Sequence, residues 1–414
     1  MIAVSRAFFY FCCMKRILPI LLVLTLAAGC RRPVLESGNW NPRVRQAIEQ
    51  MITLYGKDAK GYDPSCKPYA VFDYDNTTVI NDIAQTLLVY QIENLAFAFT
   101  PETIREVLTV GLDGWDTVYP GGLTPQRLVD DLVRDYTELY PLRNDPESYR
   151  GLAAYKDFRA KLWYLSYHSG DAHPGSEFSC VWIATLLDGM NYPEVTELTR
   201  ASVNHWMKEP QMYRENWVSP DGKVSVQIPK GLTLTPEIKE LYRGLRDNGF
   251  DVYICSASVE TIVEAMACDP SYGIGLDPAC VFGIRLRPTP AGTVHAVADS
   301  SYAQPYREGK VRCILENIAP LHGGRGPALV AGDSNGDFAM LTSFKDLKVG
   351  LIVNCLGSGA IGGLTAGAAG KQADVRLKGR ETPLYVVQGR DPSAFGFIPH
   401  WESAPVPLLP EGRE

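Results

Sequence analysis

The sequence predicts an α/β fold: a parallel sheet with helices on both faces, and an all-α domain inserted after the first strand of the sheet. Three observations predict it. A short apolar stretch at residues 67–75, KPYAVFDYD, ends in two aspartates; residues 81–231 carry apolar side chains at helical spacing; from residue 232 onward, strand-like and helix-like stretches alternate. Strands that alternate with helices form parallel sheets, which need cover on both faces.

The first thirty residues predict export. Lys15 and Arg16 precede the apolar run ILPILLVLTLAA, which ends just before Gly29-Cys30. The run is too short to cross a bilayer as a helix, which takes about 20 residues. Residues 1–29 are therefore predicted to be a secretory signal peptide, and an uncleaved membrane anchor is the alternative.

The segment LAAGC at 26–30 resembles the lipobox of bacterial lipoproteins. This resemblance implies that Cys30 is diacylated and becomes the first mature residue. The chain would then be anchored through lipid in the bacterial periplasm or cell envelope. Residues 30–67 are assigned to a lipid tether followed by one helix.

Charge and cysteine usage exclude several classes of function. Removal of residues 1–29 takes three positive charges and moves the net charge from −7 to −10. An acidic chain without a basic run is a poor nucleic-acid binder, so no nucleic-acid partner is predicted. No C-x-x-C motif is present, which argues against a redox or zinc role. Cys268 and Cys280 flank one loop, and whether they form a disulfide stays open.

The helical and strand patterns differ clearly along the chain. Residues 42–56, PRVRQAIEQMITLYG, have helical spacing, whereas 67–75 is short, β-branched and aromatic, as a strand is. The insert at 81–231 is predicted to be helical throughout, because segments such as TPQRLVDDLVRDYTELY and YRGLAAYKDFRAKLWYLSY repeat apolar residues every three or four positions.

The core resumes after the insert. Pro236 opens a helix that Gly249 ends. Then follow the strand FDVYICSAS, the helix VETIVEAMA, a strand near VFGIRL, the helix GKVRCILENIA, the strand PALVAGD and the helix GDFAMLTSF. The core is therefore assigned to residues 68–80 and 232–378, and residues 379–414, rich in Pro and Gly, to a tail on the surface.

Polar side chains follow three of the predicted strands. Asp73 and Asp75 follow the first, Ser256 follows the second, and Asp333 and Asp337 follow the last. Ligands of an open parallel sheet gather at the carboxyl ends of its strands. Residues two positions apart project to the same side, so both early aspartates can face one site.

Several carboxylates at one site repel each other, so the site needs a positive partner. A hard divalent cation with oxygen ligands meets that need, and Mg²⁺ suits a site shared with phosphate oxygens. Lys310, at the start of a helix, adds a positive charge, while Ser256 and free backbone N–H groups can bind anionic oxygens. Together these residues predict a phosphoryl-transfer site.

DYDNT at 73–77, Ser256, Lys310 and GDSNGD at 332–337, in this order, resemble the motifs of the haloacid dehalogenase (HAD) superfamily of phosphohydrolases. The resemblance covers essentially the whole α/β part and implies a Rossmann-like core. Two positions have rivals: Lys230 also precedes a glycine, and Ser258 lies near Ser256. Lys310 is favoured because it falls between the second and fourth motifs, and Ser256 because it ends the apolar run directly.

The resemblance also implies roles. Asp73 would attack phosphorus and become an aspartyl-phosphate, and Asp75 would protonate the leaving alkoxide and then activate water. The implied ligands of Mg²⁺ are Asp73, the main-chain carbonyl of Asp75, Asp333 and, in support, Asp337. Because the superfamily's dehalogenases lack the second acid, Asp75 favours phosphate esters as substrates.

The helical insert resembles a C1-type cap, which closes over the site and selects the substrate. The chain is similar to phosphoserine-phosphatase-like and phosphorylcholine-phosphatase-like enzymes. In the former, a carboxylate nine residues after the nucleophile binds the substrate amine; here that position is Asp82, whose alternative role is to cap a helix.

A quaternary ammonium would instead need aromatic faces. The insert offers Tyr90, Trp115, Tyr119, Trp163, Tyr164, Tyr167, Trp182, Trp206, Tyr213 and Trp217, most of them expected in the core.

The predicted function is therefore an exported Mg²⁺-dependent phosphomonoesterase for a small phosphate ester, phosphorylcholine or phosphoserine-like. The alternatives are a degenerate surface lipoprotein that binds a ligand or partner, and a phosphotransferase to an acceptor other than water. No protein partner is predicted.

GSGAIG at 357–362 fits a dinucleotide motif, but no acid follows at the required distance, so a dinucleotide site is not expected.

Overall fold

The computed structural model of the chain describes residues 34–35, 38–115, 117–171, 178–287, 289–295, 297–373 and 382–408. The sheet, its helices and the insert all belong to the unit that runs from Ser37 to Glu414. The predicted signal peptide, residues 1–29, and Cys30 lie outside the described residues. Within the described ranges, every helix falls short of the length or apolar character that a membrane span requires.

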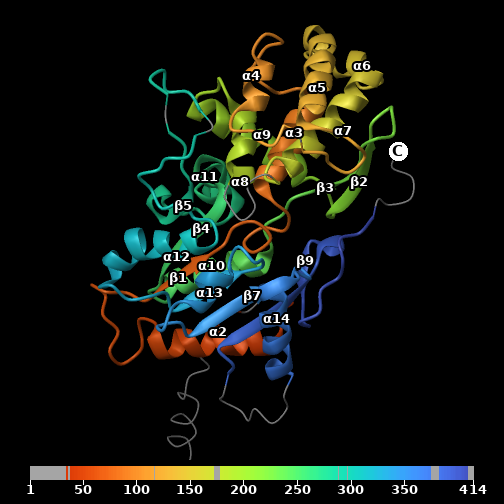
Figure 1. Ribbon diagram of the computed structural model, residues 1–414. Coiled ribbons are helices and arrows are strands. Elements are labelled where there is room, and N and C mark those ends of the chain that lie inside the picture. Colours follow the sequence, from red (N-terminus) through yellow and green to blue (C-terminus); the bar gives the residue numbers. More distant parts are fainter. Residues whose placement is uncertain are drawn as a thin grey trace, which may run out of the picture. The chain divides into compact units, whose positions relative to one another are not determined.

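The strands of the central sheet, within the described residues, are β1 (Tyr69–Phe72), β4 (Asp251–Val259), β5 (Val281–Ile284), β6 (Leu329–Gly332), β7 (Val349–Val353), β8 (Tyr385–Asp391) and β9 (Gly396–Ile398). Their order is β5-β4-β1-β6-β7-β8-β9, so β1 lies between β4 and β6. In Figure 1, β1 lies beside β4, its parallel neighbour. All neighbours are parallel except β9, which runs antiparallel to β8. The predicted α/β fold with a parallel sheet is confirmed.

The helices that accompany the sheet are α2 (Pro42–Tyr55), α10 (Pro236–Asp247), α11 (Glu260–Ala267), α12 (Glu308–Cys313), α13 (Phe338–Thr342) and α14 (Gly359–Gln372). Alternate side chains of β1 show that both faces are covered. Val71 packs into a buried cluster with residues of α12, α13 and α14. Phe72, on the opposite face, packs on Tyr242 of α10 with ring centroids 4.5 Å apart.

Local sequence explains where α10 begins and ends. The Thr235 hydroxyl accepts a hydrogen bond from the N–H of Ile238 at 3.3 Å, and Pro236 occupies the first turn. Gly249 follows the helix with φ +83°, and a Cβ there would lie 2.4 Å from the Tyr62 hydroxyl oxygen. Glycine is therefore required at this turn for both backbone and packing reasons.

The insert leaves the core after β1 and returns before α10. Its helices are α3 (Ile83–Asn94), α4 (Ile104–Thr109), α5 (Pro125–Leu139), α6 (Pro146–Tyr149), α7 (Ala153–His168), α8 (Phe178–Ile183) and α9 (Tyr192–Trp206). At the two connections, the Ile80 N–H donates to the Thr233 carbonyl at 2.8 Å, and the Asn81 side chain donates to the Gly231 carbonyl at 2.8 Å. The outgoing and returning segments are thus tied together at the base of the insert.

The prediction that the insert is all-α needs one correction. It ends in an antiparallel hairpin of β2 (Tyr213–Val218) and β3 (Ser225–Lys230). Trp217 of this hairpin is fully buried, and the guanidinium of Arg159 on α7 lies over its ring at 5.1 Å. The alternation typical of a half-buried strand is broken here, because Glu215, on the same face as Trp217, is charged and pairs with Lys230.

The central sheet also continues past residue 378, the predicted end of the core. β8 and β9 supply its last two strands, from the segment that was predicted to be a surface tail. Gln388 of β8 is fully buried and its Oε1 accepts from the Asn41 N–H at 2.8 Å, next to the start of α2. This contact joins residues 347 positions apart in the chain, which local patterns do not reveal.

The loop between Cys268 and Cys280 is not closed by a disulfide. Both cysteines are free thiols in the structure.

Candidate active site

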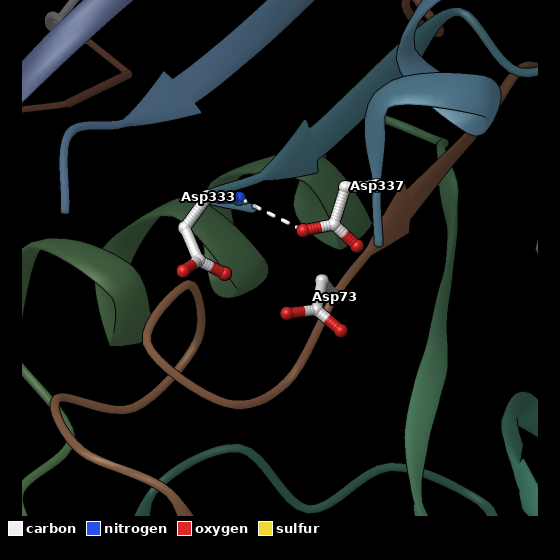
Figure 2. A group of neighbouring side chains, drawn as sticks. All are labelled: Asp73, Asp333 and Asp337. Atoms are coloured by element: carbon white, nitrogen blue, oxygen red, sulfur yellow. Dashed lines mark hydrogen bonds between the residues drawn. The ribbon is translucent and has the colours of Figure 1, made fainter. Parts of the chain in front are cut away.

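Three aspartates from two neighbouring strands meet at one edge of the sheet. Asp73 follows β1, and Asp333 and Asp337 follow β6, which is paired with β1. One carboxylate oxygen from each lies within 4.8 Å of the others, and all three residues are buried. Figure 2 shows the three carboxylates pointing toward a common space. The structure therefore brings together acids that are separated by most of the chain.

The loop after β6 fixes the carboxylate of Asp337. Its Oδ2 accepts from the N–H groups of Asp333 and Ser334, both at 3.0 Å, the first of which is the dashed line in Figure 2. A Cβ at position 332 would lie 2.5 Å from the Asp337 Cβ, so Gly332 is required for this approach. Thr77 donates to Oδ1 of Asp333 at 3.1 Å. These contacts orient the acids before any ligand binds.

Lys310 supplies positive charge inside the cluster. Its Nζ donates to Oδ1 of Asp73 and to Oδ1 of Asp337, both at 2.6 Å, and its side chain is 2% exposed. Burial alone would lower the pKa of Lys310, but Asp337 and Asp73 outweigh it and raise the pKa above its ordinary value. The rival Lys230 pairs with Glu93 and Glu215 in the insert instead. Lys310 is therefore the lysine of this site.

The acids remain difficult to ionise despite that lysine. Burial, followed by repulsion from Asp337, raises the pKa of Asp73 to about 7. Burial also raises the pKa of Asp333, with Asp337 and Asp73 adding repulsion. A further positive charge at the cluster would lower these pKa values, because opposite charge favours the ionised form. The cluster thus has the chemistry of a cation site as well as the geometry.

Asp75 lies outside the three-acid cluster. Its Oδ2 accepts from the Ser258 hydroxyl at 2.6 Å, and its Oδ1 accepts from the Ile83 N–H, at the start of α3, at 2.7 Å. Burial and the neighbouring Asp82 raise the pKa of Asp75 to about 8. A carboxyl group with this pKa holds a proton at neutral pH and can donate it.

The two candidate serines on β4 differ in their contacts. Ser258 hydrogen-bonds to Asp75, whereas the hydroxyl of Ser256 is fully buried and accepts from the Ser258 N–H at 3.1 Å. The predicted role of the Ser256 hydroxyl in binding phosphate stays a prediction. The contact between Ser258 and Asp75 joins residues 183 positions apart, so nothing local indicated it.

Asp82 caps α3 and also lines a pocket beside the acids. Its Oδ1 accepts from the Gln85 N–H at 2.8 Å, and burial raises its pKa to about 6. The pocket has a volume of about 410 Å³. It is lined by Asp82, Ala84, Gln85, Leu88, Trp163, Ser166, Tyr167, Cys180, Ile183, Arg214, Gln227, Pro229, Ala257 and Ser258. The insert and the end of β4 therefore share this pocket, and the capping role of Asp82 does not exclude contact with a ligand.

Arg390 of β8 is a site residue that the sequence patterns do not predict. Its side chain is buried, and one guanidinium N–H donates to Oδ1 of Asn76 at 3.1 Å. Asn76 follows Asp75 directly and has φ +59°, in the left-handed region. The charge of Arg390 also lowers the pKa of Asp333 against the effect of burial. The only sequence sign was the β-branched run of β8, within the segment assigned to a tail.

Comparison with known structures places the chain in a family. A conserved protein of unknown function from Anaerococcus prevotii has a crystal structure with 30% sequence identity and a TM-score of 0.79. The match covers 90% of this chain and 99% of that one. The chain belongs to the family of the Anaerococcus protein. The crystal structure of that protein shares the fold described above over nearly its whole length.

A second similarity concerns sequence. Phosphorylcholine phosphatase from Pseudomonas aeruginosa is 24% identical over 268 residues. The match covers 64% of this chain, and this chain spans about 60% of the length of that protein. It supports the resemblance to HAD phosphatases that the motifs imply. No model of a known protein family matches the sequence.

One further structure is a substrate-bound phosphoserine phosphatase. It aligns at 14% identity with a TM-score of 0.35, over 69% of this chain and 86% of that one. Similarity at that level has no bearing on the assignment.

Proposed function

We propose that the protein is an exported, Mg²⁺-dependent phosphomonoesterase that hydrolyses a small phosphate ester through an aspartyl-phosphate. The observation that carries this proposal is the buried cluster of Asp73, Asp333 and Asp337, with Lys310 hydrogen-bonded to two of its members. The order of the motifs and the similarity to a named phosphatase support it. A structural role for so many buried charges is disfavoured, because buried ion pairs contribute little net stability.

The reaction would take place in two steps. A carboxylate oxygen of Asp73 attacks phosphorus, the bond to the ester oxygen breaks, and Asp75 gives its proton to the leaving alkoxide. Asp75, now ionised, then takes a proton from a water that attacks phosphorus, which releases phosphate and restores Asp73. Ser258 and the N–H of Ile83 hold the Asp75 carboxyl group in place through both steps.

The acids fit the metal that this chemistry needs. The cluster offers oxygen ligands only, and its three ligand atoms lie within 4.8 Å of one another, as hard divalent cations require. Asp73 and Asp333 would hold Mg²⁺, with Asp337 in support; the role of the Asp75 carbonyl stays a prediction. Bound Mg²⁺ supplies positive charge that offsets the negative charge of the transferred phosphoryl group. Lys310 adds to that charge from its position beside Asp73.

The pocket supports a small leaving group. Its volume of about 410 Å³ suits an alcohol of a few carbon atoms more than a macromolecule. Phosphorylcholine is a candidate substrate because the Pseudomonas relative is named for it. Phosphoserine is a second candidate, since Asp82 stands in the pocket wall where an amine would bind.

The test uses p-nitrophenyl phosphate, with and without added Mg²⁺. We expect hydrolysis only with Mg²⁺, and no turnover by Asp73→Asn, which removes the attacking oxyanion while keeping the shape. Asp58→Asn, at an exposed aspartate outside the site, is the matched control and should keep full activity. A folded Asp73→Asn protein with wild-type activity would refute the assignment. An excess of alcohol that diverts phosphate to a new ester would favour a phosphotransferase.

We also propose that the protein is anchored in the cell envelope through lipid on Cys30. Support comes from the basic, apolar and lipobox-like order of the first thirty residues. Full-length protein and a Cys30→Ala variant are compared for incorporation of labelled fatty acid and for membrane fractionation. We expect label and membrane association only with Cys30 present. Label in both proteins, or in neither, contradicts this proposal.

A further inference from the structure

Among the described residues that line the pocket beside the acids, one positively charged side chain has no partner. Arg214 of β2 is half-buried and lines the pocket. Among the described residues, no hydrogen bond or ion pair engages its guanidinium group. Of the described residues that line the pocket, only Arg214 and Asp82 carry a charged side chain, and Oδ1 of Asp82 already accepts from the backbone of α3.

Strand geometry explains why Arg214 faces the pocket. In the hairpin, Arg214 lies opposite Pro229, and two positions away Asn216 lies opposite Gln227. Residues two apart on a strand, and residues directly opposite, share one face. Both Pro229 and Gln227 line the pocket, so Arg214 belongs to its wall.

The acid next to Arg214 in the sequence, Glu215, lies on the opposite face of the same hairpin. Glu215 pairs there with Lys230, and Lys230 also pairs with Glu93. Arg159 makes a further contact with Glu215 at 3.3 Å. The carboxylate next to Arg214 in the sequence, Glu215, is therefore paired with other cations on the face that does not line the pocket.

A half-buried guanidinium without a partner in the protein can bind an anion. Its planar set of donors matches a carboxylate with two parallel hydrogen bonds, and part of its hydration is already lost. A negative group in this pocket would also lie near the acids of the active site, which repel it. Such a group therefore needs a cation of its own, because Lys310 is occupied by Asp73 and Asp337.

A quaternary ammonium fits this pocket less well. Among the described residues that line the pocket, only Trp163 and Tyr167 are aromatic. Trp182, Trp206 and Trp217 are buried in the core of the insert. A cation cage needs several aromatic faces, and Arg214 would repel its ligand.

We propose that the substrate is the phosphate ester of a small hydroxy acid, whose carboxylate binds Arg214 during hydrolysis. This inference rests on the proposed phosphomonoesterase function. It makes Arg214 the residue that sets the charge preference for the leaving group. Esters with a carboxylate are then better substrates than esters of the same length with no charge or with an ammonium group.

The test compares three two-carbon esters that differ in charge: 2-phosphoglycolate, ethyl phosphate and phosphoethanolamine. The wild-type protein should have the highest kcat/KM for 2-phosphoglycolate. Arg214→Met should lower the ratio of kcat/KM for 2-phosphoglycolate to that for ethyl phosphate by about 10- to 100-fold, the worth of a charge-assisted hydrogen bond. Arg214→Lys keeps the charge without the planar fork and should recover part of the ratio.

Lys223→Met is the matched control, since it removes one positive charge from an exposed position in the turn of the same hairpin. It should leave the ratio of kcat/KM values at the wild-type level. Equal losses for all three esters in Arg214→Met would show a structural role and overturn the proposal. A wild-type preference for phosphoethanolamine or phosphorylcholine would overturn it too.

The outcome for p-nitrophenyl phosphate separates the two proposals. If that ester and ethyl phosphate are hydrolysed without any preference for 2-phosphoglycolate, only the assignment of Arg214 fails. If no ester is hydrolysed with Mg²⁺ present, the proposed function and this inference fail together.

Discussion

Replacing Lys310 with methionine tests how the buried acids are held together. Methionine keeps the apolar stem and removes the ammonium group that donates to Asp73 and Asp337 at 2.6 Å. The variant therefore leaves two buried carboxylates facing each other without the lysine between them. We expect it to fold with lower stability and to lose most of its phosphatase activity.

The expected loss can be estimated from the burial of this group. Removing one member of a buried ion pair costs about 3–5 kcal/mol of unfolding free energy, because the other charge stays buried without a partner. An unfolding entropy of about 2.1 cal/mol/K per residue converts this, for a chain of this length, into a fall in Tm of about 3–6 °C. Lys310 is 2% exposed at its side chain, so solvent screening does not reduce the effect.

The assay is thermal unfolding by circular dichroism, in EDTA and in excess Mg²⁺. In EDTA the Lys310→Met variant should show the full loss. Mg²⁺ should raise the Tm of the variant more than that of the wild type, because the cation replaces the missing positive charge. Lys223→Met, at an exposed lysine, is the control and should unfold with the wild type.

A double variant makes the test sharper. Lys310→Met with Asp337→Asn removes the lysine together with one of the carboxylates it neutralises, so it should be more stable than Lys310→Met alone. Unchanged Tm and full activity in Lys310→Met would refute the reasoning. So would a double variant that is destabilised by the sum of the two single losses.

Three further predictions concern other parts of the molecule. Arg390→Met removes the donor to Asn76 and should lower the unfolding free energy, measured in urea, by about 1.5–3 kcal/mol. Ser258→Ala removes the hydrogen bond that lowers the pKa of Asp75. The alkaline limb of kcat/KM should therefore move to higher pH, by about half a pH unit. Burial and a neighbouring aspartate raise the pKa of Asp135 in the insert to about 7, so the folded state binds its proton more tightly than the unfolded state. The free energy of unfolding should therefore fall as pH rises from about 4 to about 7. Between about pH 5 and about pH 7, urea unfolding should show a fall that is about 2 kcal/mol smaller in Asp135→Asn than in the wild type.

Each of these predictions has an outcome that contradicts it. Arg390→Met with wild-type stability would mean that the guanidinium contributes no net energy to the loop after β1. A Ser258→Ala profile that coincides with wild type would remove Ser258 from the environment of Asp75. An Asp135→Asn protein whose stability still falls by the same amount with pH would show that another group titrates in that range.

Local sequence determined the elements of the core and the acids at its strand ends. Apolar β-branched runs, a proline at the start of α10 and Gly249 after it act within a few residues, so they can be recognised without a structure. The positions of Asp73 and Asp333 follow from the same logic. Parallel strands carry their loops at one edge, so acids that end two strands come close when those strands are neighbours.

Tertiary structure alone decided the partners of these residues. It placed Ser258 against Asp75 across 183 positions of the chain, and Arg390 against Asn76 across 314. It also turned Arg214 toward the pocket by pairing β2 with β3. Such contacts depend on strand order and on which face of a strand is buried. Both are set by close packing among segments that are distant in the sequence, and these segments meet only in the folded chain.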